Sequence, residues 1–431
     1  MVVFTGGRRC FSVEFTEKQL KRSRILYIIE ATVEYFISLL VAGSYLATIT
    51  RELGLSDSLT GILSSMVSLG CVFKLAALAI RPRTVKRLAT VLSIANQLLF
   101  LMLYVIPITP ISGTVKTVVF VASLALAYVI FNLIEPHKLS WLMSLVEDGK
   151  RGRFTADKEI VSLISGMVFS FAMGTVMDHF VLGGDTRTAF IIAAIVLFTL
   201  SVIHTLTLLF TVEKELPDKK NVPLKVSVKR VLCNKNVLLA SVVYIFHYLS
   251  NYAAVPFYGT YMIGELGFTL QFVSVLSIGA SIVRVFVSRA WGRYADKNSF
   301  ASMTAWCFAV LGLAYVCVVF ATPGNGAVMM ALYYILHGIA FGGVNSALTN
   351  LVFDYASLED RAAAIGVSRA VAGVLGFFTT VAVSPFVAYV QENGNTLFGM
   401  SVYAQQVTSA FSAIVIFCGA IYAGKVLAKR K

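Results

Sequence analysis

The sequence predicts an all-α polytopic membrane protein with twelve transmembrane helices in two pseudo-symmetric six-helix bundles. Its composition and an internal repeat support this prediction. The chain has 431 residues, of which 58% are hydrophobic and 13% are charged, and its mean hydropathy is +0.80. One soluble core could not bury so much apolar side chain. As a helix, roughly 20 consecutive apolar residues cross a hydrocarbon core of about 30 Å and satisfy their own backbone hydrogen bonds.

Twelve apolar segments of that length follow one another, with short connections between most of them. The exception is the charged, proline-containing stretch 213–235, which leaves six segments on each side. The predicted domains are an N-terminal segment 1–24, a first bundle 25–212, a linker 213–235, a second bundle 236–424 and a tail 425–431. The segments are centred near residues 36, 68, 98, 126, 168, 200, 249, 279, 311, 337, 374 and 411.

The basic residues predict the orientation, because Lys and Arg accumulate in short cytoplasmic loops. With a cytoplasmic N-terminus, 30 of the 36 basic residues fall on the inner side, and only Arg51, Lys116 and Arg187 fall outside. We expect no signal peptide, since the first span is too long and too polar for one. Both termini are predicted to be cytoplasmic in a cell membrane. This topology explains the net charge of +14, so we expect contact with anionic lipid and not with nucleic acid.

The sequence lacks the common motifs of catalytic and metal sites. It contains no HExxH, no GxSxG and no P-loop, and its cysteines form no CxxC pair. We therefore expect no metal, no other cofactor and no enzymatic activity, and packing roles for the cysteines. These are Cys10, Cys71, Cys233, Cys307, Cys317 and Cys418.

The two halves carry traces of an internal repeat. A shift of 213 residues places RELGLSDSLTGILSSM, from Arg51, on GELGFTLQFVSVLSIG, from Gly264, so that Glu-Leu-Gly falls on Glu-Leu-Gly. A shift of 210 to 212 residues places LVEDGKRGRF, from Leu145, against SLEDRAAAIG, from Ser357. The repeats share one topology, so we expect the halves to be related by an axis along the membrane normal, an arrangement known among transporters.

The chain resembles the major facilitator superfamily in helix count, six-plus-six symmetry and loop motifs. The segment WGRYADKNS matches the opening of the family's inner-loop signature at Gly292, Asp296 and Lys297, although Ser299 stands where a later glycine belongs. In AIRPRTVKR, between the second and third spans, Pro82 occupies the aspartate position of the same signature. The RGRF at 151–154 is similar to the family's fourth inner loop.

The resemblance implies an inner gate that involves Asp296. In the resembled fold this carboxylate would lie against the start of the fifth span, near Arg153, where a helix N-terminus and an arginine both favour an acid. Such a link would hold the halves together in the outward-facing state and break in the inward-facing one. The other interpretation is that Asp296 only terminates its helix.

The first span carries two carboxylates, Glu30 and Glu34, one helical turn apart. Glu34 lies about 15 Å along the helix from Arg24, too deep in the hydrocarbon to reach water easily, so it needs a partner, a proton or an aqueous cavity. The resemblance implies a central cavity lined by the first, fourth, seventh and tenth spans. The 213-residue shift sends Glu34 to His247 and Ser38 to Asn251.

Polar side chains also occur in the other two expected lining spans: Asn132, Glu135, His137 and Lys138 in the fourth, and His337, Asn345 and Asn350 in the tenth. The intramembrane acids Glu30, Glu34 and Glu135 balance Lys74, Lys138 and Arg284, as expected if charges pair across a cavity. We expect Arg284 to pair with a glutamate of the first span. His204, in the sixth span, is expected to bond a backbone carbonyl.

The sequence favours a secondary active transporter that moves a small solute by alternating access, with a proton as coupling ion. In this hypothesis Glu34, with Glu30 or His247, binds and releases the proton. Two alternatives stay open: the carboxylates only fix helix packing, or the protein is a non-transporting solute sensor on the same fold. Symport and antiport are both compatible with the sequence. Acids in the first span favour cationic or neutral solutes, and we expect a monomer.

Overall fold

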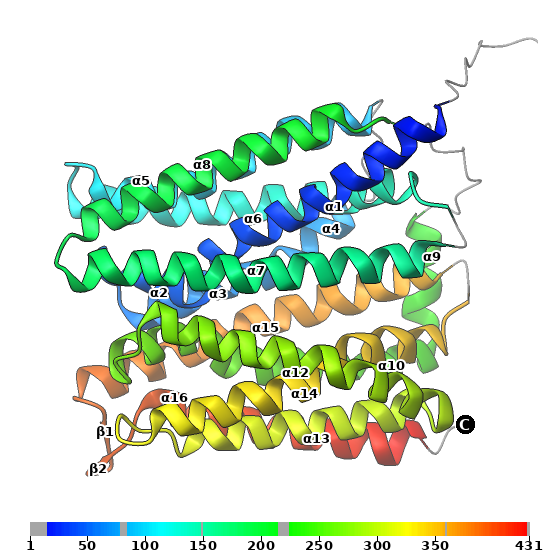
Figure 1. Ribbon diagram of the computed structural model, residues 1–431. Coiled ribbons are helices and arrows are strands. Elements are labelled where there is room, and N and C mark those ends of the chain that lie inside the picture. Colours follow the sequence, from blue (N-terminus) through cyan, green and yellow to red (C-terminus); the bar gives the residue numbers. More distant parts are fainter. Residues whose placement is uncertain (1–14, 78–83, 148–149, 214–223, 358–359, 429–431) are drawn as a thin grey trace, which may run out of the picture.

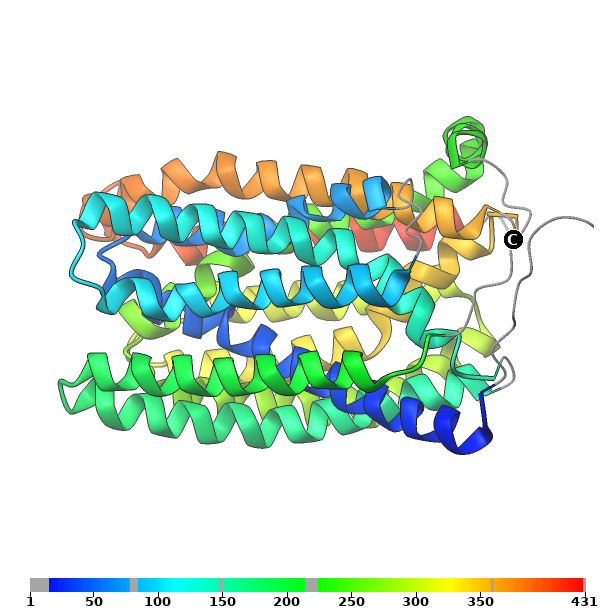
Figure 2. The same ribbon diagram turned by 90° about the horizontal axis from the view of Figure 1, so that it is seen from above.

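The computed structural model describes residues 15–77, 84–147, 150–213, 224–357 and 360–428. Long helices run along one common direction and make a bundle (Figures 1 and 2). The first helix begins, and the last one ends, at the same end of this bundle, which we call the termini end (Figure 1). The other end is called the opposite end. Pro82 and Cys10 lie outside the described residues.

The first half of the chain contains eight helices among the residues described. A bend after Leu40 separates α1 from α2, and Gly70 separates α3 from α4. The bounds are α1 Glu17–Leu40, α2 Gly43–Glu52, α3 Asp57–Leu69, α4 Cys71–Ala77, α5 Val85–Ile108, α6 Gly113–Met143, α7 Arg151–Leu182 and α8 Thr186–Phe210.

The second half begins with α9, which lies across the termini end of the bundle (Figures 1 and 2). A 3-10 turn Val255–Phe257, the short α11 Tyr258–Thr260 and a π-helical turn Tyr261–Glu265 continue α10. The other bounds are α9 Leu224–Cys233, α10 Lys235–Ala254, α12 Leu270–Lys297, α13 Phe300–Val319, α14 Gly326–Phe353, α15 Arg361–Glu392 and α16 Ala404–Tyr422, with a final π-helical turn Ala423–Leu427. Between α15 and α16, β1 Thr396–Leu397 pairs antiparallel with β2 Met400–Ser401 at the opposite end.

The helices fit the predicted number of spans. Ten helices of the described residues are long and apolar enough to cross a membrane, and the bent pair α1 and α2 would be an eleventh. The remaining predicted span, near residue 68, corresponds to α3 and α4, which end at Ala77, where a described range ends. The all-α polytopic prediction is confirmed, and twelve spans are compatible with it.

Local sequence explains where several helices begin and end. Side chains of Thr16, Ser56, Thr269 and Ser299 accept hydrogen bonds from backbone N–H groups of the first turn that follows, which would otherwise lack partners. The two copies of the repeated Glu-Leu-Gly also end alike. Gly54 and Gly267 have φ of 66° and 68°, a left-handed conformation that favours glycine.

Each half has its own core. The largest cluster of buried apolar side chains lies within 231–427, and the second lies within 33–200 with Leu270 as its one member from the other half. Glycines allow close helix packing inside the second half. A Cβ on Gly338 would lie 2.4 Å from the carbonyl oxygen of Ala280, so α14 approaches α12 backbone to backbone there.

Candidate functional site

A cavity of about 860 Å³ lies between the two halves. Side chains of α1, α6 and α14 line it together with Tyr258 and Gly259 of α11, and thus all four predicted lining spans contribute. The second, third, fifth and eighth spans, through α3, α5, α7 and α12, also contribute, which the resemblance did not imply. The charged residues and the histidine on its wall are Glu34, Glu135, Lys138, Lys158, Glu159, Arg284 and His337.

Lys138 of α6 holds both glutamates of the first span. Its Nζ lies 2.5 Å from Oε1 of Glu34 and 2.7 Å from Oε1 of Glu30. The spacing of four residues puts both carboxylates on one face of α1, so that a single ammonium can reach them. Lys138 and Glu30 are almost fully buried, whereas the Glu34 side chain is 33% exposed and lies on the cavity wall.

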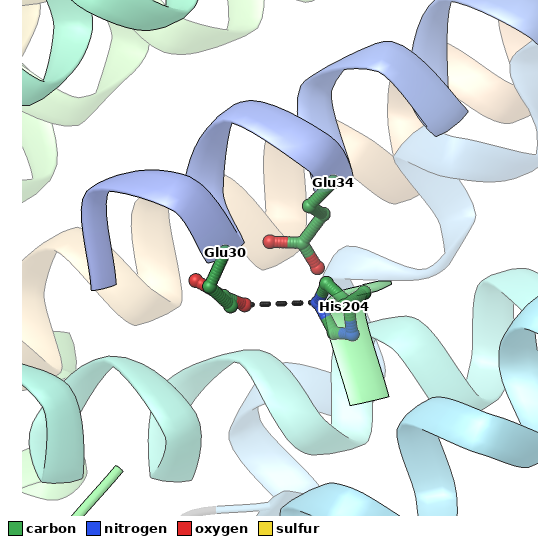
Figure 3. Close-up of side chains that lie close together, drawn as sticks. All are labelled: Glu30, Glu34 and His204. Atoms are coloured by element: carbon green, nitrogen blue, oxygen red, sulfur yellow. Dashed lines mark hydrogen bonds and ion pairs between the residues drawn. The ribbon is translucent and has the colours of Figure 1, made fainter. Parts of the chain in front are cut away.

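His204 joins this cluster from α8. Its Nε2 lies 3.0 Å from Oε1 of Glu30, and its Nδ1 is buried without a hydrogen-bond partner among the described residues. Figure 3 shows the three side chains of Glu30, Glu34 and His204 facing one another. The expectation that His204 bonds a backbone carbonyl is therefore wrong. A buried imidazole next to an ionised acid gains more from a charged hydrogen bond than from a neutral carbonyl.

The same three side chains have the composition of a metal site, because one ligand atom of each lies within 4.8 Å of the others. Lys138, however, contacts both carboxylates at 2.5 and 2.7 Å. A positive charge is thus already supplied where a metal ion would bind. We call Glu30, Glu34, Lys138 and His204 the charge cluster.

A second ion pair lies in the same half. Lys74 of α4 contacts Glu135 of α6, and Glu135 also lines the cavity. The expectation that Arg284 pairs with a glutamate of the first span is wrong, since Lys138 takes both carboxylates. Lys138 is part of the same long helix as Glu135 and reaches α1 from within the half, whereas Arg284 belongs to the other half.

At the opposite end, hydrogen bonds join the two halves directly. The carboxylate of Asp178, on α7, accepts hydrogen bonds from the backbone N–H groups of Leu270 (2.9 Å) and Gln271 (2.6 Å), the first residues of α12. Gln391 of α15 donates to Asp57 at 2.6 Å. The Ser58–Ser384 and Ser170–Ser274 hydroxyl pairs lie nearby along the same helices, at 2.6 and 2.9 Å.

Four other predicted residues lie away from the cavity wall. His247 is buried with its ring against Phe308 and Phe341, and its Nδ1 has no hydrogen-bond partner among the described residues. Asn132 is buried and donates to the Tyr128 carbonyl. Asn251 is half-buried and Asn345 exposed, and neither lines the cavity.

Sequence reasoning missed two features of the site. Asp178 was not singled out, and only its place near the end of a span hinted at a contact between halves. Gln97 of α5 lines the cavity, is 4% exposed, and its Oε1 has no hydrogen-bond partner among the described residues. A buried glutamine in an apolar span was the signal that could have found it.

Comparison with models of known families shows which family the chain belongs to. The family model of the Major Facilitator Superfamily matches residues 25–380. The chain belongs to the Major Facilitator Superfamily. A search of curated proteins gives no match for this superfamily member.

Solved transporters of known fold resemble this superfamily member at low sequence identity. The nucleoside transporter NupG has a TM-score of 0.67 at 13% identity, with 94% of this chain and 99% of that chain covered. A bacterial homologue of the human lysosomal transporter Spinster, inward-facing and unoccupied, has 0.70 at 12%, covering 96% and 98%. A D-xylose–proton symporter has 0.61 at 12%, covering 93% and 97%. These likenesses show the fold.

The residues that match the superfamily's inner-loop signature lie at the termini end. Gly292, Asp296 and Lys297 are exposed in the last turns of α12. Arg153, at the start of α7, lies 3.9 Å from Asp157 of its own helix. Among the described residues no ion pair joins Asp296 to Arg153, so the inner gate stays a hypothesis about another conformation.

Proposed function

We propose that this protein is a secondary active transporter that moves a small solute across the cell membrane by alternating access, coupled to protons. The termini end would face the cytoplasm, with residues 25–212 and 236–424 as the two moving bundles. The observation that supports this most is the charge cluster beside the cavity, in which one ammonium contacts two carboxylates and two members, Glu34 and Lys138, line the cavity wall.

The net charge of the charge cluster allows it to bind one proton. With neutral imidazole it carries two negative charges and one positive charge. Glu34 is its only member that is more than slightly exposed, so a proton from the cavity would reach Glu34 and leave the Lys138–Glu30 pair intact. Because proton affinity depends on solvation and neighbouring charge, movement of the halves would change how tightly Glu34 holds that proton.

The contacts at the opposite end support alternating access. Asp178 completes the hydrogen bonds of the first α12 turn from the other half, and Asp57 does the same for the Gln391 amide. A bundle motion that opened this end would have to break these bonds and solvate their groups. We therefore infer that the described conformation is closed at the opposite end and that its cavity opens towards the termini end.

The cavity has the polar groups that a small solute needs. Hydroxyl groups such as those of Ser38 and Ser277 offer hydrogen bonds, and aromatic rings such as Tyr128 and Tyr333 offer flat apolar surface. The similar structures include a nucleoside transporter and a D-xylose–proton symporter, so nucleosides and pentoses, each together with its phosphorylated derivative, are the first solutes to test.

The test is solute uptake into proteoliposomes with and without an imposed proton gradient. We expect gradient-driven accumulation in the wild-type protein, loss of accumulation with retained downhill exchange in Glu34→Gln, and normal transport in Glu52→Gln, an exposed glutamate at the end of α2 that does not line the cavity. Normal accumulation by Glu34→Gln would remove Glu34 from the mechanism. Solute binding without any flux would instead favour the solute sensor.

A further inference from the structure

Arg284 is a cation on the cavity wall, and among the described residues no carboxylate forms an ion pair with it. We propose that Arg284 binds an anionic group of the transported solute, a carboxylate or a phosphate. The inference rests on the proposed function, because it names the chemical class of the solute that this cavity takes.

Arg284 and Lys158 are the two cations of the cavity wall that have no ion pair among the described residues; Lys158, near the start of α7, lies over the Tyr27 ring, whereas Arg284 lies in the middle of α12. Of the three basic residues predicted inside the spans, Lys138 is neutralised by Glu30 and Glu34, and Lys74 contacts Glu135. Within the described ranges, no carboxylate lies at ion-pair distance from the Arg284 guanidinium, although its side chain is half-buried. An ionised group at such a depth is costly, and one that faces a water-accessible cavity typically marks a solute pathway.

The surroundings of Arg284 suit a ligand that touches both halves. Tyr35 of α1, in the first half, and His337 of α14, in the second, line the same cavity as Arg284. Its helix is held in place by the glycines of α14: a Cβ on Gly342 would lie 3.2 Å from the Arg284 carbonyl oxygen, and one on Gly338 would clash with Ala280. The guanidinium is thus presented from a rigid helix pair.

The acids on the wall leave this cation uncompensated. The expectation that the glutamates of the first span favour cationic or neutral solutes assumed that both carboxylates were unpaired, but Lys138 contacts both. Glu135 is taken by Lys74. Glu159 is exposed near the start of α7, where water screens its charge.

Guanidinium chemistry determines the ligand class. Its planar fork of N–H donors matches the two oxygens of a carboxylate or phosphate, and such charged hydrogen bonds are stronger than neutral ones. A neutral sugar or nucleoside would leave the fork without its charge partner. An anionic solute would supply one and bring the charge near this part of the wall to balance.

The experiment uses the purified full-length protein in detergent, without a proton gradient. Thermal stabilisation and its concentration dependence are measured with matched probes: uridine monophosphate against uridine, glucose 6-phosphate against glucose, and benzoate against benzamide. We expect the anion of at least one pair to stabilise the protein at lower concentration than its neutral counterpart. A phosphate or a carboxylate preference then follows from which pair responds.

Variants assign the effect to this side chain. Arg284→Gln should weaken binding of the responding anion by about 10- to 100-fold, the range for a lost charged hydrogen bond, and leave its neutral counterpart unchanged. Arg284→Lys should lose less, because it keeps the charge without the fork. Arg289→Gln, an exposed arginine of the same helix that does not line the cavity, should bind as the wild-type protein does.

Three results would overturn the proposal: equal stabilisation by both members of every pair, unchanged anion binding in Arg284→Gln, or no stabilisation by any anion at millimolar concentration. None of these bears on proton coupling, which is measured by flux in Glu34→Gln. Conversely, loss of gradient dependence leaves the anion test intact. The two proposals can therefore fail separately.

Discussion

The two halves of this bundle share one architecture but bury different chemistry. In the first half, polar side chains in the membrane pair as ions: Lys138 with Glu30 and Glu34, and Lys74 with Glu135. In the second half the corresponding space is filled with rings. His337 stacks on Phe341 with centroids 4.1 Å apart, and His247 lies 5.6 Å from the same ring.

This difference explains why the internal shift aligned positions without predicting their roles. The shift sends Glu34 to His247, yet Glu34 faces the cavity and His247 lies among rings. Two halves can share one fold when their helix lengths, turns and packing surfaces match. Charged side chains need specific partners, and among the described residues the ion pairs inside the membrane-spanning helices lie in the first half. The four changes that follow probe this contrast, beginning with the largest expected effect.

Lys138→Met should destabilise the first half most. Removal of the ammonium leaves Glu30 and Glu34 close together with little water, and breaking a buried ion pair from one side costs about 3–5 kcal/mol. Chemical unfolding in detergent measures the change. The triple variant Lys138→Met, Glu30→Gln, Glu34→Gln should recover most of the loss, because no unpaired charge remains; a triple variant as unstable as the single one would contradict the ionic explanation.

Gly338→Ala probes the second half through packing alone. The new methyl would lie 2.4 Å from the backbone oxygen of Ala280, which cannot rotate away, so α12 and α14 must separate at a cost of about 1–3 kcal/mol. Thermal unfolding gives the effect. Gly279→Ala is the matched control, since a Cβ there meets nothing within 4 Å. Equal stability of the two variants would show that the helix contact is looser than described.

Asp178→Asn tests the contact between the halves. The amide accepts the α12 backbone hydrogen bonds less well than a carboxylate, which should remove about 0.5–2 kcal/mol from the state closed at the opposite end. Spin labels on the exposed residues Leu182 and Val328 report the distance between the halves there. Asp185→Asn is the control, because Asp185 caps its own helix α8. An unchanged distance distribution in Asp178→Asn would count against this gate.

The smallest effect is expected at Glu147, in the connection between α6 and α7. Lys150 and Arg24 lower the pKa of this exposed carboxyl from its ordinary value near 4.5. Since the folded pKa is below the unfolded one, the stabilisation is complete above about pH 4.5 and is lost as the pH falls through the lowered folded value. Glu147→Gln should therefore flatten the acid limb of the stability profile slightly and leave neutral pH almost unchanged. An acid limb that stays as steep in the variant would refute this.

The sequence predicted the features that depend on composition and periodicity. The length of the apolar segments was enough to predict an all-α polytopic membrane protein, and the four-residue spacing of Glu30 and Glu34 placed both on one face of a helix. The sequence could not predict which side chains pair across helices, because several cations were equally available. Arg284 was expected as the partner of a first-span glutamate, but Lys138 has that role. His204 was expected to bond a carbonyl, but it bonds Glu30. The domain bounds and the inner gate stay predictions.

Lys138 provides, as part of the chain, the positive charge that some transporters obtain by binding a cation from solution. Its ammonium already lies against the oxygens that a sodium or potassium ion would seek. A sodium or potassium ion would have to displace the Lys138 ammonium, which is covalently attached and always lies close to the two carboxylates. The proposed solute transport should therefore proceed equally well when choline replaces sodium and potassium ions in the buffer.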